Sequence, residues 1–256
     1  MQLTWYGTGT ILFSAGNKNI LFDPFISMNP KAGSFDHLAA KNIRDIMITH
    51  GHFDHLVNVP ELVRNEERTV YCSQESANTL QGEGVAPHMV KMIKPADSLQ
   101  LDPFKIRVLK GKHIEFDLEL IADTIINRRM VKYFGNFLKI GRLNRKYIKG
   151  EVLAFDIEAN GKRVLHLGSL DIDEEEHYPQ GVDLLTIPFQ GRSDIEECAL
   201  YIVEELKPKA VFMHHFDDTF PPISRFVDYR GFVRAMESKF PSIEVIVPDY
   251  REPVTI

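Results

Sequence analysis

The densest group of potential metal ligands in this 256-residue chain lies at residues 50–55, with the sequence HGHFDH. Imidazole nitrogens and carboxylate oxygens are donors that zinc and related divalent ions take in proteins. His50 and His52 are two residues apart in a segment that reads as extended, so their side chains point the same way and can bind one ion. Asp54 and His55 follow at once and face a neighbouring position. The spacing therefore predicts a metal site.

A buried strand is expected to position this segment. Residues 43–49 (IRDIMIT) are largely apolar and run directly into His50. Other polar residues follow apolar stretches in the same way: Asp23 after 20–22, His113 after 106–109, Ser169 and Asp171 after 164–167, and His214 and His215 after 210–213. This pattern is typical of a site assembled along one edge of a sheet.

The order of the expected elements divides the chain into two halves of mixed strands and helices. In the first half we expect strands at 3–7, 10–15, 19–23, 69–72 and 99–109, with helices at 59–64 and 74–80. In the second half we expect a hairpin of 152–157 and 163–167, strands at 184–188, 210–213 and 243–247, and helices at 195–206 and 232–240. Strands followed by helices in each half predict two α/β layers packed back to back.

Composition excludes several classes of protein. Hydrophobic residues make up 44% and charged residues 26% of the chain, as in an ordinary soluble globular protein. No apolar leader precedes the first strand, no window is long enough to span a bilayer, and Cys72 and Cys198 form no CxxC motif. We therefore expect a cytoplasmic protein with reduced thiols. The net charge of −6 argues against a nucleic-acid partner.

Positive charge is concentrated in residues 124–149. This segment holds eight of the 30 Lys and Arg residues and none of the 36 Asp and Glu residues, which leaves the rest of the chain at −14. On a helical wheel its apolar and basic residues take opposite faces: Ile126, Met130, Tyr133, Phe137 and Ile140 on one, and Arg128, Lys132, Lys139, Arg142 and Lys146 on the other. Gly135 and Gly141 predict two shorter helices rather than one.

A basic segment inserted directly after His113 is expected to lie at the mouth of the metal site. Such a lid suits an anionic substrate, such as a phosphodiester or a phospholipid headgroup, and we expect Arg128, Lys132 and Lys139 to contact it. Two alternatives remain for the same pattern. The segment packs for structure alone, or it docks onto a membrane surface.

Taken in order, these motifs resemble those of metallo-β-lactamase-fold hydrolases, in the branch of ascorbate-lactonase-like proteins and the phospholipase D that acts on N-acyl phosphatidylethanolamines. The resemblance covers nearly the whole chain: residues 4–7 (TWYG), 22–24 (FDP), 49–55 (THGHFDH), His113, 168–169 (GS), 187–188 (IP) and 215–218 (HFDD). It implies an α/β fold, a four-layer αββα sandwich, formed by one domain over residues 1–256. Residues 117–150 would be a lid-like helical insertion.

The resemblance also implies roles for single residues. One ion would be held by His50, His52 and His113, and a second by Asp54, His55 and His215. His215 is preferred to the alternative His214 because the family's late histidine is usually followed by an aromatic residue, here Phe216. Asp23 would orient a histidine ligand, unless it serves only as a turn-forming Asp-Pro. One or two divalent ions are expected, zinc first, with manganese or iron as alternatives.

Ser169 departs from the family pattern. The family usually has Gly-Asp where this chain has Gly168-Ser169, and that aspartate bridges the two metals. Serine is a poor ligand for a hard cation. Three outcomes stay open: Asp171 reaches in, water replaces the carboxylate, or the second ion binds weakly.

The expected chemistry is hydrolysis by a metal-bound hydroxide. A metal in an open site lowers the pKa of bound water to ~7, and Asp54 is placed to hold or deprotonate that nucleophile. We expect a metal-dependent hydrolase of an anionic small molecule or a phosphodiester. The alternatives are a lactonase or amide hydrolase, and a non-catalytic metal-binding scaffold, which Ser169 favours. The sequence leaves the oligomeric state open.

Overall fold

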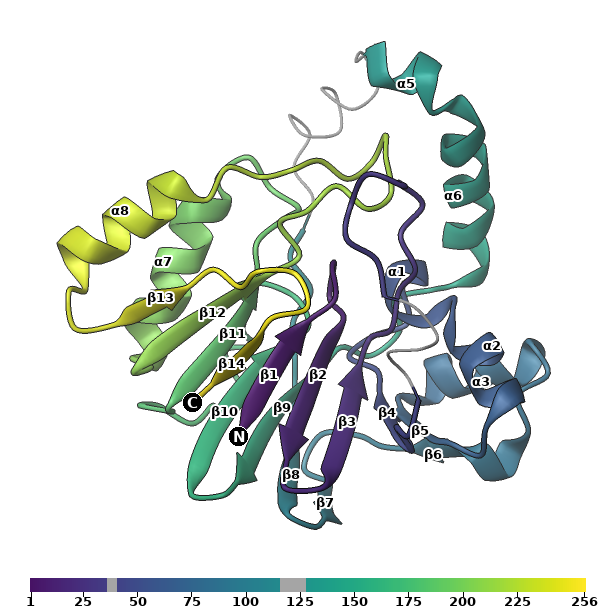
Figure 1. Cartoon of the computed structure of the whole chain (residues 1–256), viewed down its shortest axis with the longest axis horizontal. Coiled ribbons are helices and arrows are strands. Elements are labelled where there is room, and N and C mark those ends of the chain that lie inside the picture. Colours follow the sequence, from purple (N-terminus) through teal and green to yellow (C-terminus); the bar gives the residue numbers. More distant parts are fainter. Residues whose placement is uncertain (36–40, 116–127) are drawn as a thin grey trace.

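Two seven-stranded sheets face each other in the computed structural model, which describes residues 1–35, 41–115 and 128–256 except the side chain of Asn65 (Figure 1). The first sheet has the strand order β14-β1-β2-β3-β4-β5-β6. Its strands are β1 Gln2–Trp5, β2 Ile11–Ala15, β3 Lys18–Phe22, β4 Asp45–Met47, β5 Thr69–Cys72, β6 Val90–Met92 and β14 Pro253–Thr255. The second sheet has the order β13-β12-β11-β10-β9-β8-β7. Its strands are β7 Ser98–Leu101, β8 Phe104–Lys110, β9 Leu153–Ala159, β10 Lys162–Leu167, β11 Leu184–Pro188, β12 Ala210–His214 and β13 Glu244–Ile246.

Each sheet is antiparallel at one end and parallel at the other. In the first, β14, β1, β2 and β3 pair antiparallel, while β3, β4, β5 and β6 pair parallel. In the second, β7 to β10 pair antiparallel and β10 to β13 pair parallel. The parallel strands of each sheet therefore end at a common edge, where the loops that follow them can meet.

Successive side chains of a strand point to opposite faces of the sheet, and both faces are buried. In β3, Ile20 and Phe22 belong to the core between the sheets, whereas Leu21 points to the other face. This is the two-residue period of a strand that is buried on both faces. Phe22 meets Phe155 of β9 with ring centroids 5.3 Å apart, so aromatic packing joins the two sheets directly.

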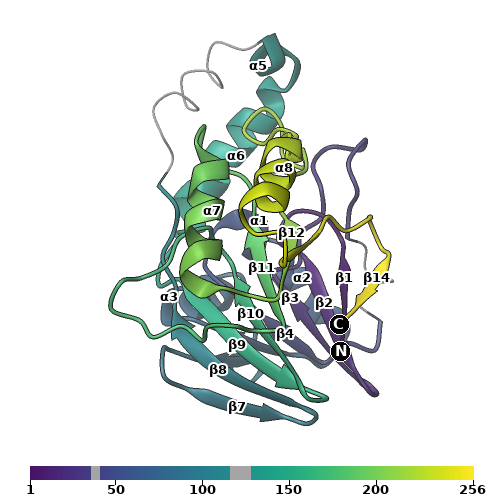
Figure 2. The ribbon, with the colours of Figure 1, turned by 90° about the vertical axis from the view of Figure 1, so that its left-hand side faces the viewer.

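Helices cover the outer faces of both sheets (Figure 2). On the first sheet these are α1 Phe53–Leu56, α2 Val59–Asn65 and α3 Gln74–Gly82, with the short 3-10 helix Pro87–Met89 nearby. On the second they are α7 Ile195–Leu206 and α8 Arg230–Lys239. Helix, sheet, sheet and helix form the four-layer sandwich expected from the sequence, and that prediction is confirmed.

The basic segment forms two helices, α5 Arg128–Lys132 and α6 Phe134–Lys146, as expected. The break lies at Tyr133, so the prediction that Gly135 and Gly141 interrupt the helix is wrong; both lie inside α6. Neither glycine has a neighbour that an added side chain would meet, so both lie in open space along the helix. Ile126 and the first part of the expected insertion, residues 117–127, lie outside the described residues.

One expected strand is wrong and two strands were not predicted. Residues 99–109 form a hairpin of β7 and β8 around Asp102-Pro103 rather than one strand, because proline cannot donate to a sheet ladder. The short strands β6 and β14 carry no alternating pattern of their own and form by pairing with β5 and β1. Among the described helices, none is both long and apolar enough to cross a bilayer.

Candidate metal centre

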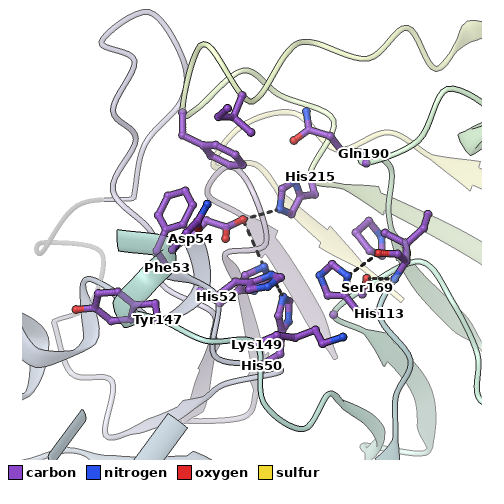
Figure 3. A pocket seen from close by; sticks show the side chains of 18 of the residues that line it. His50, His52, Phe53, Asp54, His113, Tyr147, Lys149, Ser169, Gln190 and His215 are labelled. Atoms are coloured by element: carbon purple, nitrogen blue, oxygen red, sulfur yellow. Dashed lines mark hydrogen bonds and ion pairs between the residues drawn. The ribbon is translucent and has the colours of Figure 1, made fainter. Parts of the chain in front are cut away.

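The residues of the HGHFDH segment lie where β4 gives way to α1 (Figure 3). His52 is the residue before the first turn of α1 and keeps an extended backbone. Asp54 and His55 are already within the helix. Because the backbone changes from extended to helical here, His50 and His52 point to one place and Asp54 and His55 point to another place beside it.

The first cluster consists of His50, His52 and His113. Each offers a ligand atom within 4.8 Å of the others. His50 Nε2 lies 3.1 Å from His52 Nδ1, and the His113 ring centroid lies 5.0 Å from that of His50 and 4.7 Å from that of His52. Three imidazoles that converge in this way are a donor set for a divalent ion.

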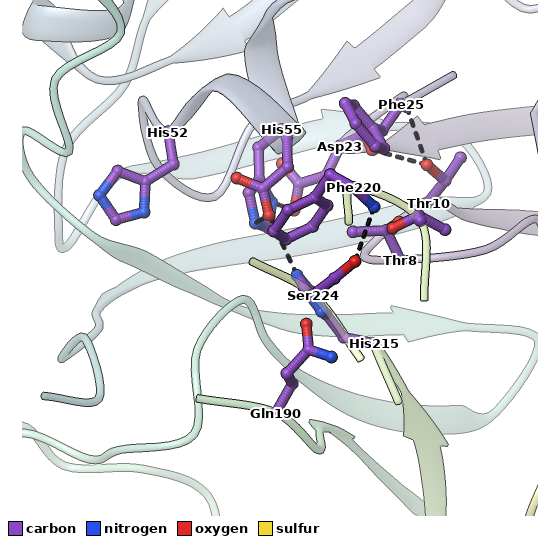
Figure 4. Close-up of polar contacts among 12 residues, drawn as sticks. Thr8, Thr10, Asp23, Phe25, His52, His55, Gln190, His215, Phe220 and Ser224 are labelled. Carbon is purple, nitrogen blue, oxygen red and sulfur yellow. Dashed lines mark hydrogen bonds and ion pairs between the residues drawn. The ribbon is translucent and has the colours of Figure 1, made fainter. Parts of the chain in front are cut away.

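The second cluster consists of Asp54, His55 and His215, again with ligand atoms within 4.8 Å of one another. Figure 3 labels Asp54 and His215, and Figure 4 labels His55 and His215. Asp54 Oδ2 lies 3.2 Å from His215 Nε2 and 3.6 Å from His55 Nε2. All three residues are nearly or fully buried. The buried His215 Nδ1 has no hydrogen-bond partner among the described residues. A carboxylate and two imidazoles also fit a divalent ion.

The loop after β12 holds His215 against the first sheet. The His215 backbone N–H donates to Thr8 O over 3.0 Å, and the Thr8 N–H donates to both carboxylate oxygens of Asp217 over 3.0 Å. Burial raises the pKa of Asp217 to about 6, although the bond from Thr8 opposes that shift. His215 itself takes a left-handed backbone conformation, with φ of 60°. Contacts between the two sheets therefore fix this ligand candidate.

Asp23, at the end of β3, supports the second cluster without entering it. Its Oδ2 lies 3.0 Å from His55 Nδ1. The Thr49 backbone N–H donates to Asp23 Oδ1 over 2.8 Å, and the Thr49 hydroxyl donates to Oδ2 over 2.7 Å. Gly9 packs against the same histidine, and a Cβ at Gly9 would lie 3.0 Å from the His55 ring. These contacts hold the His55 ring in one orientation, and the expectation that Asp23 orients a metal ligand stays a prediction.

Burial and neighbouring charges give the two clusters different electrostatics. Burial lowers the pKa values of His50, His52 and His113, that of His113 to about 4, and nearby imidazoles add to the effect. Burial alone would lower the pKa of His55, but Asp23 and Asp54 outweigh it and raise the pKa. Burial would likewise raise the pKa of Asp54, whereas His55 and His215 bring it below its usual range. The first cluster is therefore neutral, and Asp54 is ionised at neutral pH.

The structure places the candidate residues for the bridging position differently. Ser169 lines the cavity and is buried, and its Oγ accepts from the Ile114 N–H over 3.0 Å. Asp171 does not line the cavity; its Oδ2 lies 3.2 Å from Lys112 Nζ. His214 is fully buried and stacks on His166 at 5.7 Å between centroids, so His215 joins the cluster and His214 does not.

A cavity of about 600 Å³ opens over both clusters. Apolar side chains form much of its wall: Phe53, Phe137, Tyr147, Ile148, Phe220 and Ile223. Lys149 is the one Lys or Arg among its described lining residues. Figure 3 shows Lys149 beside His50 and His113, and its charge contributes to lowering the pKa values of His52 and His113. Arg128, Lys132 and Lys139 are exposed and are not brought into the cavity.

Several residues of the site could not be identified from motifs in the sequence. Thr49, Lys149 and Gln190 lie in or under the cavity wall, yet none belongs to a spacing that predicts chemistry. Lys149 counted only as one of eight charges of the basic segment. Its place depends on a backbone hydrogen bond from Gly51 N–H to Lys149 O, 2.8 Å long, which no pattern of residues indicates.

Comparison with known families identifies this constellation. The sequence pattern of the beta-lactamase superfamily domain matches residues 2–215. The chain belongs to this superfamily. A metal-dependent hydrolase of Staphylococcus aureus (strain MRSA252) is 26% identical over 230 residues, covering 88% of this chain and 89% of that protein. The chain is thus a metal-dependent hydrolase with a metallo-β-lactamase fold, and the non-catalytic scaffold finds no support.

Solved structures agree on the fold. A metallo hydrolase from the hyperthermophilic archaeon Ignicoccus hospitalis superposes with a TM-score of 0.67 at 22% identity, covering 99% of this chain and 97% of the other. An isothiocyanate hydrolase from Delia radicum gut bacteria gives a TM-score of 0.63 at 14% identity, covering 100% and 99%. At these identities the superpositions establish the fold, and the branch within the superfamily stays a prediction.

Proposed function

We propose that this metal-dependent hydrolase acts on an anionic small molecule, with phosphodiesters as the first class to test. The observation that supports the proposal is Lys149, a cation in the wall of an otherwise largely apolar cavity, next to the cluster of His50, His52 and His113. An ammonium group at the edge of an apolar cavity favours an anionic group of the substrate.

We propose the two clusters as the sites of one or two divalent ions, with zinc as the first expectation. Ions held there would supply an activated water and would polarise the scissile carbonyl or phosphoryl group. In the cluster of Asp54, His55 and His215, the Asp54 carboxylate faces the cavity and is ionised at neutral pH, so it can hold the attacking water and accept its proton. Asp23 keeps the proton of His55 on Nδ1, which leaves Nε2 for an ion.

Lys149 would orient the substrate rather than take part in proton transfer. The Lys149 carbonyl accepts a hydrogen bond from the N–H of Gly51, which lies directly between His50 and His52, so the Lys149 backbone is held next to these two histidines. The apolar wall from Phe53, Phe137 and Phe220 would bind the uncharged part of the substrate and limit access of water. Arg128, Lys132 and Lys139 do not line the cavity, so it does not support the prediction that they contact the substrate.

A lactone or amide is the second candidate substrate, favoured by the same apolar wall. The two candidates differ in their need for Lys149. The test uses steady-state kinetics of the metal-loaded protein on bis(4-nitrophenyl) phosphate and on a neutral aryl lactone. Lys149→Gln should raise KM for the phosphodiester roughly twofold to fivefold and leave kcat nearly intact, because a solvent-accessible charge pair is worth up to about 1 kcal/mol.

Lys239→Gln is the matched control, since Lys239 is exposed at the end of α8 and far from the cavity. It should change neither parameter. Metal content is measured for both variants to show that the clusters are intact. If Lys149→Gln hydrolyses the phosphodiester like wild type, or if only the lactone is turned over, the anionic substrate is rejected.

A further inference from the structure

Helix α6 presents one regular stripe of side chains to the cavity. Phe137, Ile140, Asn144 and Tyr147 follow each other at spacings of three or four residues and share one face of a helix. Phe137, Asn144 and Tyr147 line the cavity, and Ile140 is buried in the core beneath it. The apolar side chains on this face of α6 are therefore explained by their contacts with the cavity and the core.

A second stripe faces away from the protein. Phe134, Leu138, Arg142 and Arg145 have the same spacing of three or four residues and are all exposed. Phe134 is 55% and Leu138 46% exposed, and Val131 of α5 is 85% exposed. Of the seven exposed large hydrophobic side chains in the described parts of the chain, four lie between Arg128 and Lys149. Ile148 lines the cavity, so the clustering of Val131, Phe134 and Leu138 needs an explanation.

The cations around this stripe have no acidic partner among the described residues. Within residues 1–35, 41–115 and 128–256, no ion pair involves Arg128, Lys132, Lys139, Arg142 or Arg145. Arg129 and Lys146 differ, because they bind Asp218 and Glu83 and so attach α5 and α6 to the body of the protein. Figure 1 shows both helices rising beyond the ends of the strands. The exposed side chains are thus carried on a projecting arm that is held in place at two points.

We propose that this outer face of α5 and α6 docks onto an anionic lipid surface. Val131, Phe134 and Leu138 would enter the boundary between headgroups and acyl chains, while Arg128, Lys132, Lys139, Arg142 and Arg145 would lie at the level of the lipid phosphates. The three apolar side chains stand on a projecting helix, a small and convex area compared with the ~800 Å² per partner of a stable protein interface. A lipid surface needs no complementary shape.

The proposal does not depend on the substrate of the hydrolase, because vesicle binding is measured without turnover. The metal-loaded protein is sedimented with vesicles of phosphatidylcholine and with vesicles of phosphatidylcholine and phosphatidylglycerol, at low and high salt. Binding is expected to the anionic vesicles alone and to weaken with salt.

Two sets of substitutions separate the charge from the apolar side chains. Lys139→Gln with Arg142→Gln and Arg145→Gln should lower the partition coefficient at least about tenfold, because each cation near an anionic surface contributes separately. Val131→Ser with Phe134→Ser and Leu138→Ser should lower it by a similar factor without changing the melting temperature, since all three side chains are exposed. Lys94→Gln with Lys105→Gln and Lys239→Gln removes the same charge from exposed positions elsewhere and should leave binding unchanged.

Three results would overturn the proposal. The first is no binding to anionic vesicles at low salt, and the second is equal binding to neutral ones. The third is a dimer in sedimentation velocity that disappears when Val131, Phe134 and Leu138 are replaced by serine, because the apolar stripe would then serve a second copy of the chain.

Discussion

Three of the candidate ligand histidines have one ring nitrogen fixed by a neighbour, which determines the nitrogen left for an ion. His113 Nδ1 donates to Ile114 O over 2.6 Å, and His55 Nδ1 faces Asp23 at 3.0 Å. The Thr49 hydroxyl gives its hydrogen to Asp23, so it accepts from His50 Nδ1 at 3.0 Å. In each case Nε2 keeps its lone pair, and the imidazole is in the tautomer that a metal ligand needs.

Replacing His52 by alanine should remove metal from the first cluster and abolish hydrolysis. A lost ligand weakens binding, and a bound ion stabilises only the folded state, so the melting temperature should also fall. Metal content by mass spectrometry, activity and thermal unfolding check this prediction. His88→Ala is the control, because His88 is exposed on the 3-10 helix. A His52→Ala protein with full metal content and rate would show that the first cluster is assigned incorrectly.

Ser169→Asp should raise the metal content of the second cluster. The change places a carboxylate where a buried hydroxyl lines the cavity, and it can keep the hydrogen bond from Ile114. The measurement is the ratio of metal to protein at equal free metal. Asp171→Asn should leave this ratio unchanged, since Asp171 pairs with Lys112 outside the cavity. An unchanged ratio in Ser169→Asp would mean that position 169 does not reach the ions.

The candidate ligands could be predicted from the sequence better than the residues that support them. The HGHFDH spacing and the polar residues after apolar stretches gave a wider set of candidates, and the family resemblance reduced it to the six members of the two clusters. The supporting residues act through contacts with residues that are distant in the sequence, as Asp217 does with Thr8 and Thr49 does with Asp23. Such contacts cannot be predicted from a single sequence, and the same holds for the place of Lys149 in the cavity wall.

At the scale of elements, the site depends on how α6 leads back into the second sheet. The residues after α6 pass directly over Gly51, with the Gly51 N–H donating to Lys149 O and the Ile148 carbonyl close to the Gly51 Cα. The HGHFDH segment and the exit from the basic insertion are thus packed backbone to backbone. At the other end of α6, the break from α5 lies at Tyr133, whereas helix propensity alone indicated Gly135 and Gly141.

Gly51→Ala should therefore damage both stability and metal binding. An added Cβ would lie 2.2 Å from Ile148 O, so the loop or the chain after α6 must move. We expect a loss of about 1–3 kcal/mol in the free energy of unfolding, typical of overpacking, together with weaker metal binding. Urea denaturation and metal titration measure the two effects. Gly82→Ala is the control, because nothing lies near the added Cβ in α3. Equal behaviour of the two variants would contradict the close packing.

At the scale of the whole molecule, the core between the sheets is apolar except for a few polar groups, among them His166 and His214. His166 is fully buried and its Nδ1 lies 2.7 Å from the Thr186 hydroxyl. Burial lowers the pKa of His166 to about 4, and burial also lowers the pKa of His214. The folded protein therefore keeps these imidazoles neutral at pH values at which the unfolded chain protonates them.

This difference predicts a loss of stability in mild acid. Between the unfolded pKa of about 6.5 and the folded value of about 4, the unfolded state binds more protons, so stability falls as pH falls through that window. The contribution of His166 is at most about 3 kcal/mol and levels off below pH 4. Urea denaturation of metal-free protein at several pH values should show a shallower dependence for His166→Gln than for wild type. Parallel curves would mean that His166 does not titrate on unfolding.

Each proposed ion takes ligands from both sheets. In either cluster two ligands come from the segment after β4 of the first sheet, and the third, His113 or His215, follows a strand of the second. The ions would then join the two sheets, and any separation of the sheets would take one ligand away from each ion. The rate at which a chelator strips the metal would report on that opening motion. Tighter packing of Phe22 against Phe155, in the core between the sheets, would oppose this separation and so slow the loss of metal.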